Sequence, residues 1–241
     1  MPETLIQHLE SLIDEKVQRN MAKIVPNVAD LIPQTEEDFG EITKFGLYPA
    51  ESCVPFVTKQ GTPFYQLDNM AMVPKNSPEN NYHYGDWEFR QLEVLYHMPR
   101  MVSREAHEWL RDNLFQGSRV DARKKAEYKA KFRNDHRADW GSGMQIEWMK
   151  YCLQLKWRDN ALFRKDLLAT AGKLPVEDAT ETNYDSNLFW GARLVEVGGK
   201  KFYFGCNVLG ELLAQLRINK GKLPYTLPDN FHIFGEPILK L

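Results

Sequence analysis

Several carboxylate and tryptophan side chains stand at positions where they could form a site for a flat base carried on a sugar. Glu88 follows a long polar loop, and Trp140 lies between two charged, helix-prone stretches. Asp185, Asn187 and Trp190 share one short run further along. An indole face can stack on a base, while a carboxylate can activate water or stabilise the cationic sugar that develops as a glycosidic bond breaks. Each residue also has a structural interpretation, with Glu88 in a solvated first helical turn and the tryptophans in the core.

The motifs of the common enzyme classes are missing. The sequence contains no GxxxxGK(S/T), GxGxxG, HExxH or GxSxG pattern, so P-loop, dinucleotide-fold, zincin and serine-hydrolase chemistries have no sequence support. The six histidines are scattered, and the three cysteines lie 99 and 54 residues apart, which leaves no CxxC pair. We therefore expect no metal site, no cofactor and no disulfide framework, as is typical of a reducing compartment.

The charge and hydropathy of the chain limit its partners. Its 31 Lys and Arg against 33 Asp and Glu give a net charge of −2, which excludes a binder that depends on overall positive charge. No apolar run approaches the roughly 18–20 residues that span a bilayer, so we expect a cytoplasmic protein without a membrane segment. Residues 119–139 are locally basic, with eight Lys and Arg against four Asp and Glu. They form either a solvated helix face or a surface that contacts the phosphates of a nucleic acid.

The elements that must position these residues indicate an α+β protein that is mainly α. The apolar spacing over residues 4–24 predicts a helix, and a polar connector marked by proline follows it to residue 38. We expect a single domain over residues 39–220 and a C-terminal tail over residues 221–241, strapped along the surface. Residues 69–85 show no periodicity and predict a long surface loop inside that domain.

Helical patterns dominate the predicted domain. Residues 87–98 predict a helix that carries Glu88 in its first turn, and residues 144–157 predict a buried central helix. Asp159 and Asn160 are placed to cap the helix that follows, and Asn207 to cap a helix with leucines at positions i, i+3, i+4 and i+7. The core of the protein is therefore expected to be mainly helical.

One β-hairpin has a clear signal in the sequence. Residues 193–197 and 200–204 are alternating, β-prone runs, and only Gly198 and Gly199 separate them. A two-residue hairpin turn needs positive φ angles, which glycine adopts at no steric cost. This hairpin is the predicted small β component.

Residues 139–219 resemble the NADAR domain family, also called the YbiA-like N-glycosidases. The resemblance consists of short motifs in the family's order and spacing, which are Trp140 after a charged residue, the helical run Leu162 to Thr170, Pro175-Val176-Glu177, Phe189-Trp190-Gly191, and Gly205-Cys206-Asn207 leading into Val208-Leu209-Gly210. Further back, residues 39–45 and 87–91 resemble the family's early aromatic segment and its acidic helix start more weakly.

The resemblance implies an N-glycosidase that hydrolyses the N-glycosidic bond of a small nucleotide-like or ADP-ribosyl substrate. Members of the family act on phosphorylated ribosylamino-pyrimidines or remove ADP-ribose from guanine in nucleic acid. Carried over by position, Glu88 would be the catalytic acid, Trp140 a stacking residue and Asn207 a polar pocket residue. A helix N-terminus attracts phosphate, which is a separate physical reason to place Asn207 in the site. Asp185, Asn187 and Trp190 would complete it, with Asp185 as a second catalytic carboxylate.

Two positions depart from the family pattern and leave a second function open. Asn187 stands where the family has Asp, with Asp185 as a possible substitute two residues earlier, and Cys206 stands where the family has Lys. An amide cannot ionise and a thiol cannot hold a fixed cation against phosphate. The alternative is therefore a non-catalytic module that binds ADP-ribose or a nucleotide. A further alternative is an interaction protein that docks through residues 1–38 and 224–241, and the oligomeric state stays open.

Overall fold

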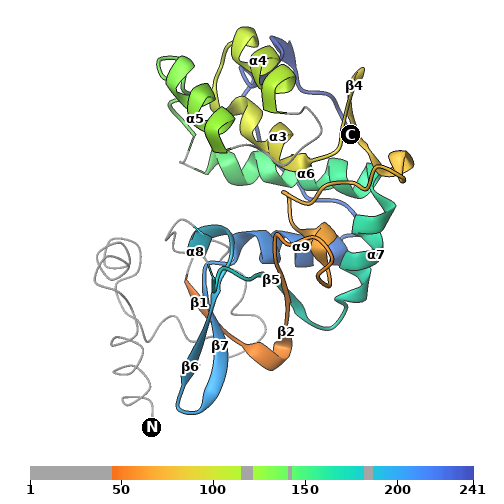
Figure 1. The fold of residues 1–241 in the computed structure, drawn as a ribbon, viewed down its shortest axis with the longest axis vertical. Coiled ribbons are helices and arrows are strands. Elements are labelled where there is room, and N and C mark those ends of the chain that lie inside the picture. The colour runs from red at the N-terminus through yellow and green to blue at the C-terminus, as the bar shows by residue number, and fades with distance from the viewer. Residues whose placement is uncertain (1–44, 115–121, 141–142, 182–186) are drawn as a thin grey trace. The chain divides into compact units, whose positions relative to one another are not determined.

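The computed structural model describes residues 45–114, 122–140, 143–181 and 187–241. The predicted N-terminal helix and connector lie outside the described residues, and so does Asp185. Within the described residues, short strands are combined with longer helices (Figure 1). The predicted class, α+β and mainly α, is confirmed.

The elements follow one another in a mixed order. The strands are β1 (Gly46–Pro49), β2 (Cys53–Phe56), β3 (Tyr82–Tyr84), β4 (Trp87–Phe89), β5 (Leu174–Glu177), β6 (Arg193–Val197), β7 (Lys200–Gly205), β8 (His232–Ile233) and β9 (Glu236–Pro237). The helices are α3 (Leu92–His97), α4 (Arg104–Leu114), α5 (Ala122–Lys131), α6 (Met144–Asp159), α7 (Ala161–Ala169), α8 (Asn187–Trp190) and α9 (Val208–Ile218).

Contacts divide the described chain into two compact units, each built from separate stretches of sequence. The first unit contains residues 45–57, 61–64, 169–181 and 187–215. The second unit contains residues 58–60, 65–114, 122–140, 143–168 and 216–241.

The first unit is built around two small sheets. Strands β1, β7 and β6 form an antiparallel sheet in that order, and β2 pairs with β5 in parallel. The predicted hairpin is confirmed as β6 and β7, with Gly198 at φ 57° and Gly199 at φ 76° in the turn. Tyr48, Cys53 and Val176 are among the buried side chains that join the strands into a core.

The second unit is organised by α6, the predicted buried central helix. Trp148, Cys152 and Leu155 are fully buried along it, as the wide apolar face of the sequence indicates. The Trp148 indole donates to the carbonyl of Leu95 at 3.0 Å, which fastens α6 to α3. Of the two predicted caps, Asp159 and Asn160, the second is the one observed, because Asn160 Oδ1 accepts from the Phe163 backbone at 2.8 Å at the start of α7.

Two sequence predictions are wrong in the region before α3. Residues 87–89 form strand β4 instead of the first turn of a helix, and the helix begins only at Leu92. Residues 69–85 are not a surface loop throughout, because they include β3 and the buried side chains of Ala71 and Val73. The physical reason is the two-residue turn at Gly85 and Asp86, with Gly85 at φ 59°, which folds β3 back on β4.

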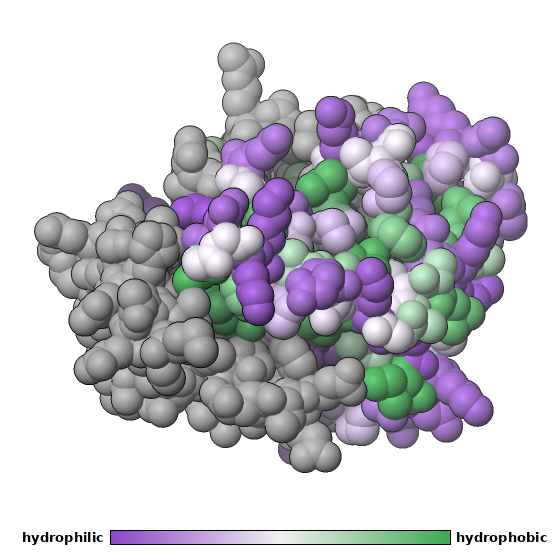
Figure 2. Space-filling model, turned by 90° about the horizontal axis from the view of Figure 1, so that it is seen from below, coloured by the Kyte–Doolittle hydropathy of each residue, from purple (hydrophilic) through white to green (hydrophobic). Residues whose placement is uncertain are grey.

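The C-terminal segment is more than a strap along the surface. Phe231 and Ile233 are buried, and β8 and β9 form a short hairpin. Figure 2 shows one face of the molecule, where hydrophilic side chains predominate and apolar areas lie between them. No helix of the described residues is long and apolar enough to cross a membrane.

Candidate functional site

In the second unit, side chains that could take part in chemistry lie together on one side of helix α3. Glu93, Tyr96 and His97 lie on α3, and Arg100 lies in the short 3-10 turn that follows it. Spacings of three, four and seven residues place them on one side of the helical path. With Trp140, described below, we name these five residues the α3 cluster.

Glu93 and His97 are held together. Glu93 Oε1 lies 2.6 Å from His97 Nε2, and the two side chains are only 14% and 6% exposed. The backbone N–H of Glu93 also donates to the Asn69 carbonyl at 3.0 Å. The contact therefore places the carboxylate beside a buried imidazole on an anchored helix, although neither ring nitrogen of His97 makes a hydrogen bond of good geometry within the described residues.

Trp140, a residue predicted from the sequence to stack on a base, lies against this side of α3. Its ring centroid is 5.5 Å from that of Tyr96, and the Arg100 guanidinium carbon lies 5.6 Å from the indole centroid. Backbone bonds fix this arrangement, because Trp140 donates to the Arg137 carbonyl at 3.2 Å and Arg137 donates to the Arg100 carbonyl at 2.8 Å. Trp140 and Arg100 are both half-buried, so part of each side chain is open to solvent.

The charges of the α3 cluster act on Tyr96. Burial raises the pKa of the Tyr96 phenol and the Glu93 carboxylate adds to this, whereas Arg100 opposes it by charge and by a hydrogen bond. The phenol therefore remains a proton donor at neutral pH. Arg100 Nε is buried and has no hydrogen-bond partner among the described residues. An unsatisfied buried donor on a cation would be stabilised by an oxygen of a bound anion.

A completely buried lysine lies within electrostatic reach of Glu93. Lys156 Nζ donates to the carbonyls of Leu67 at 3.3 Å and Asp68 at 2.8 Å. Burial lowers the pKa of Lys156 to about 7, against the opposing effect of Asp68, Asp166 and Glu93. Burial also raises the pKa of the Asp68 carboxyl, so both groups are shifted toward their neutral forms. This amine is enclosed and supports the chain around Leu67 rather than facing a ligand.

Glu88, the sequence-predicted catalytic acid, is exposed on strand β4. Asn81 Nδ2 donates to Glu88 Oε1 at 2.5 Å, and His83 lies opposite Glu88 in the hairpin register. Because side chains alternate along a strand, Glu88 points to the side opposite Trp87 and Phe89. Its contacts and those of Trp140 have no residue in common.

The other predicted site residues that the structure describes belong to the first unit. Asn207 is fully buried, and its amide is engaged by strand β5, since Nδ2 donates to the Pro175 carbonyl at 2.9 Å and Oδ1 accepts from the Glu177 N–H at 3.3 Å. Its backbone N–H donates to the Gly191 carbonyl at 3.1 Å, which brings it close to half-buried Trp190. Asn187 is the first residue of α8.

The close approach of β5 to α9 also depends on a glycine. A Cβ built on Gly210 would lie 2.0 Å from the Pro175 carbonyl oxygen and 2.3 Å from Asn207 Nδ2. Asn207 directly precedes α9, where the sequence predicts a cap, but its side chain bonds β5 and its φ is 48°. These contacts make Asn207 a structural link between β5 and α9.

Many cations of residues 119–139 that the structure describes are engaged within the protein. Lys124 contacts Glu127, Lys131 contacts Glu105, and Arg137, only 7% exposed, contacts Asp139 at 3.1 Å. Arg137 also lies over the Phe231 ring at 4.6 Å. Within the described ranges, no group of three or more His, Cys, Asp or Glu side chains is arranged to hold a metal ion.

Sequence reasoning missed Glu93, and the structure indicates why. The predicted helix began at Trp87, so Glu88 occupied the first turn that Glu93 occupies in the structure. The signal that could have found Glu93 is the i, i+4, i+7 series of Glu93, His97 and Arg100, which places an acid, an imidazole and a guanidinium on one side of a helix.

Comparisons with known proteins give a distant structural similarity. No family model matches the chain, and no curated protein matches it significantly. The NMR structure of the Escherichia coli protein YbiA is similar to this chain, with 20% sequence identity and a TM-score of 0.47 over 70% of this chain and 84% of YbiA. The α3 cluster is defined by contacts within this chain alone.

Proposed function

We propose that this chain is an N-glycosidase that hydrolyses the N-glycosidic bond of a phosphorylated nucleoside-like substrate or an ADP-ribosyl-guanine adduct. The observation that carries the proposal is the α3 cluster, which combines a fixed carboxylate, a partly open indole and a guanidinium with an unsatisfied buried donor. The motif resemblance of residues 139–219 also supports the proposal, since Trp140 belongs both to those motifs and to the α3 cluster.

Each side chain of the cluster has a role in this proposal. The exposed part of the Trp140 indole stacks on the base, and Arg100 binds a phosphate oxygen of the substrate. As the bond between the sugar carbon and the base nitrogen breaks, the Glu93 carboxylate stabilises the cationic sugar and accepts a proton from the attacking water. The water oxygen bonds to the sugar carbon, the leaving nitrogen takes a proton from solvent, and Glu93 returns the proton of the attacking water to solvent, so the carboxylate is regenerated. His97 holds Glu93 in place throughout.

The test compares three carboxylates. Purified protein is incubated with ribosylamino-pyrimidine phosphate, NAD and ADP-ribosylated guanine, and the released base is separated by chromatography. Glu93→Gln should lower kcat by about 100-fold or more, the usual contribution of a positioned acid or base. Glu196→Gln is the matched control, because Glu196 is an exposed strand carboxylate in the other unit, and it should leave kcat unchanged.

Glu88→Gln decides between the two candidate acids. If Glu88→Gln abolishes turnover while Glu93→Gln does not, Glu88 is the catalytic carboxylate and the α3 cluster is not the catalytic site. Circular dichroism of each variant separates loss of chemistry from loss of folding. If no substrate of the panel is turned over, the catalytic proposal fails.

A non-catalytic nucleotide-binding module is the second candidate function. The observation that favours it is that Glu93 is only 14% exposed and one of its oxygens already contacts His97 at 2.6 Å, which leaves the carboxylate little room for an attacking water. Saturable binding of ADP-ribose by calorimetry without product, weakened by Trp140→Leu and Arg100→Gln, would support this function. Multiple turnovers would exclude it.

A further inference from the structure

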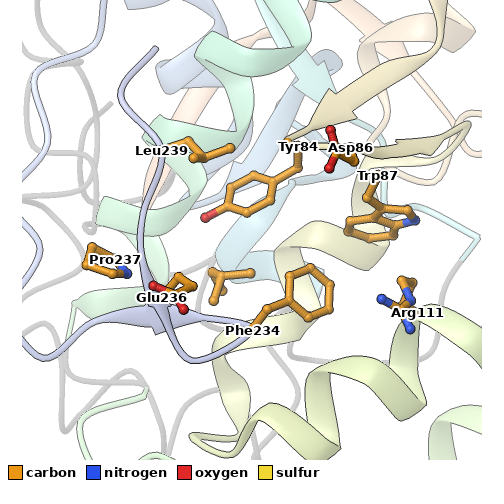
Figure 3. Close-up of a pocket in the computed structure, with 10 residues that line it drawn as sticks. Tyr84, Asp86, Trp87, Arg111, Phe234, Glu236, Pro237 and Leu239 are labelled. Carbon is orange, nitrogen blue, oxygen red and sulfur yellow. The ribbon is translucent and has the colours of Figure 1, made fainter.

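A cavity of the second unit lies apart from the α3 cluster in its lining and has a different chemistry. It has a volume of about 450 Å³ and lies among the β3–β4 hairpin, helix α4 and the C-terminal segment (Figure 3). None of its lining residues belongs to the α3 cluster. Its size falls within the usual range of small-molecule pockets.

Three aromatic side chains line this cavity. Tyr84 hangs from the hairpin, Trp87 lies on the same hairpin, and Phe234 rises toward them from the C-terminal turn (Figure 3). The Trp87 and Phe234 rings meet edge to face, with centroids 5.9 Å apart and planes at 87°. Aromatic faces carry partial negative charge, so rings that border one cavity attract a cation.

The charges at the cavity favour the same kind of ligand. Asp86 and Glu236 both line the cavity, both are exposed, and neither has a hydrogen-bond or ion-pair partner among the described residues. The cation at the cavity, Arg111, is already neutralised by Asp112, which it contacts at 2.8 and 3.3 Å. The remaining charge of the lining is therefore negative.

The protein itself supplies one example of this recognition. The Arg111 guanidinium carbon lies 5.5 Å from the centroid of Phe234. A cation therefore already rests on one ring of the cavity, and the carboxylates that could hold another are those of Asp86 and Glu236.

Phe234 is held in place at a conformational cost. Its φ is 56°, a left-handed conformation that a bulky side chain rarely adopts. Its N–H donates to His107 Nδ1 at 3.0 Å, and the opposite ring nitrogen of fully buried His107 bonds the Met101 carbonyl at 2.9 Å. A strained backbone conformation is kept only where surrounding contacts hold it, and such conformations are common at binding sites. The ring that faces Trp87 is thus preorganised.

We infer that this cavity binds an organic cation, namely an ammonium or guanidinium group carried on an apolar stem. The aromatic rings take the apolar part and the diffuse positive charge, and Asp86 and Glu236 supply the counter-charge. An anion would meet two carboxylates without a partner, and a neutral ring would leave those carboxylates uncompensated. A free small amine and a basic side chain of a peptide share this chemistry.

The experiment is calorimetric titration of the full chain with matched probes. Choline is compared with 3,3-dimethyl-1-butanol, which has the same shape without the charge, and with a short peptide that carries one lysine. We expect choline to bind at least about tenfold more tightly than the neutral alcohol, as a cation on aromatic rings should. Tighter binding of the peptide than of choline would identify a protein side chain as the source of the cation.

Variants test which residues hold the probe. Asp86→Asn combined with Glu236→Gln should weaken choline binding by about fivefold or more, and Trp87→Leu should do the same. The control combines Asp229→Asn with Glu196→Gln, two exposed carboxylates outside the lining, and should leave binding unchanged. Equal binding of choline and the neutral alcohol overturns the inference, as does unchanged binding after removal of both carboxylates or the absence of binding by every cation.

Discussion

Replacement of Asn207 distinguishes a structural residue from a substrate-binding one. The sequence predicts a polar pocket residue, whereas both halves of the amide bond the backbone of β5. Asn207→Gly removes these bonds without backbone strain, since glycine adopts φ 48° freely. Asn207→Ala removes the same bonds but keeps a Cβ in the left-handed region, which glycine would relieve.

The expected loss follows from the groups left behind. Pro175 is a buried residue and Glu177 a half-buried one, and an unsatisfied buried group costs about 1–3 kcal/mol. We therefore expect Asn207→Gly to lower the free energy of unfolding by about 2–4 kcal/mol. Asn207→Ala should lose about 1 kcal/mol more, the lower end of the cost of a left-handed L-residue.

Urea unfolding followed by tryptophan fluorescence measures both variants. Asn219→Ala is the control, because Asn219 is exposed, and it should stay within about 0.5 kcal/mol of the unmodified chain. The structural assignment is refuted if Asn207→Gly loses less than about 1 kcal/mol, the minimum cost of one orphaned buried group. Normal stability together with lost affinity for ADP-ribose would instead support the pocket role predicted from the sequence.

Two pH-dependent predictions follow from buried titratable groups. Burial raises the pKa of Glu211 from 4.5 to about 7, so the free energy of unfolding should fall as pH rises between these values. In urea unfolding, Glu211→Gln should be up to about 3 kcal/mol more stable than the unmodified chain at pH 8. At pH 4 the two proteins should be equally stable. Burial lowers the pKa of His107, while Arg137 adds to this and Asp135 opposes it. Stability should therefore fall as pH decreases below about 6.5, and His107→Gln should remove that slope in a pH series of urea midpoints, because the ring can accept the Phe234 N–H only while Nδ1 is unprotonated. The Glu211 prediction is contradicted if Glu211→Gln is no more stable than the unmodified chain at pH 8. The His107 prediction is contradicted if His107→Gln leaves the pH slope of stability unchanged.

The parts of the fold that the sequence predicts correctly are those that local rules determine. The hairpin at Gly198 and Gly199, the apolar face of α6 and the cap at Asn160 each depend on residues within a few positions of one another. The turn at Gly85 and Asp86 is equally local. Its Gly-Asp dipeptide between two aromatic runs could have predicted the hairpin of β3 and β4.

The parts that the sequence could not predict depend on distant partners. Strand β2 has no stable form alone, and its pairing with β5 cannot be read from local spacing. The same holds for the candidate site, because Trp140 contacts Tyr96 and Arg100 from about 40 residues away. An acid near an aromatic ring in sequence, such as Glu88 beside Trp87, is no guide to which acid shares a site with a tryptophan in space.

The parallel pairing of β2 with β5 has a consequence for synthesis of the protein on the ribosome. Cys53 pairs with Leu174, and Gly46 of β1 pairs with Gly205, so the strands of the first unit that emerge early wait for partners more than a hundred residues later. At about 5–20 residues per second, this delay is roughly 6–24 s for β2. During this interval the edges of β1 and β2 are open to pairing with other chains, which makes early binding by a chaperone an advantage for this topology.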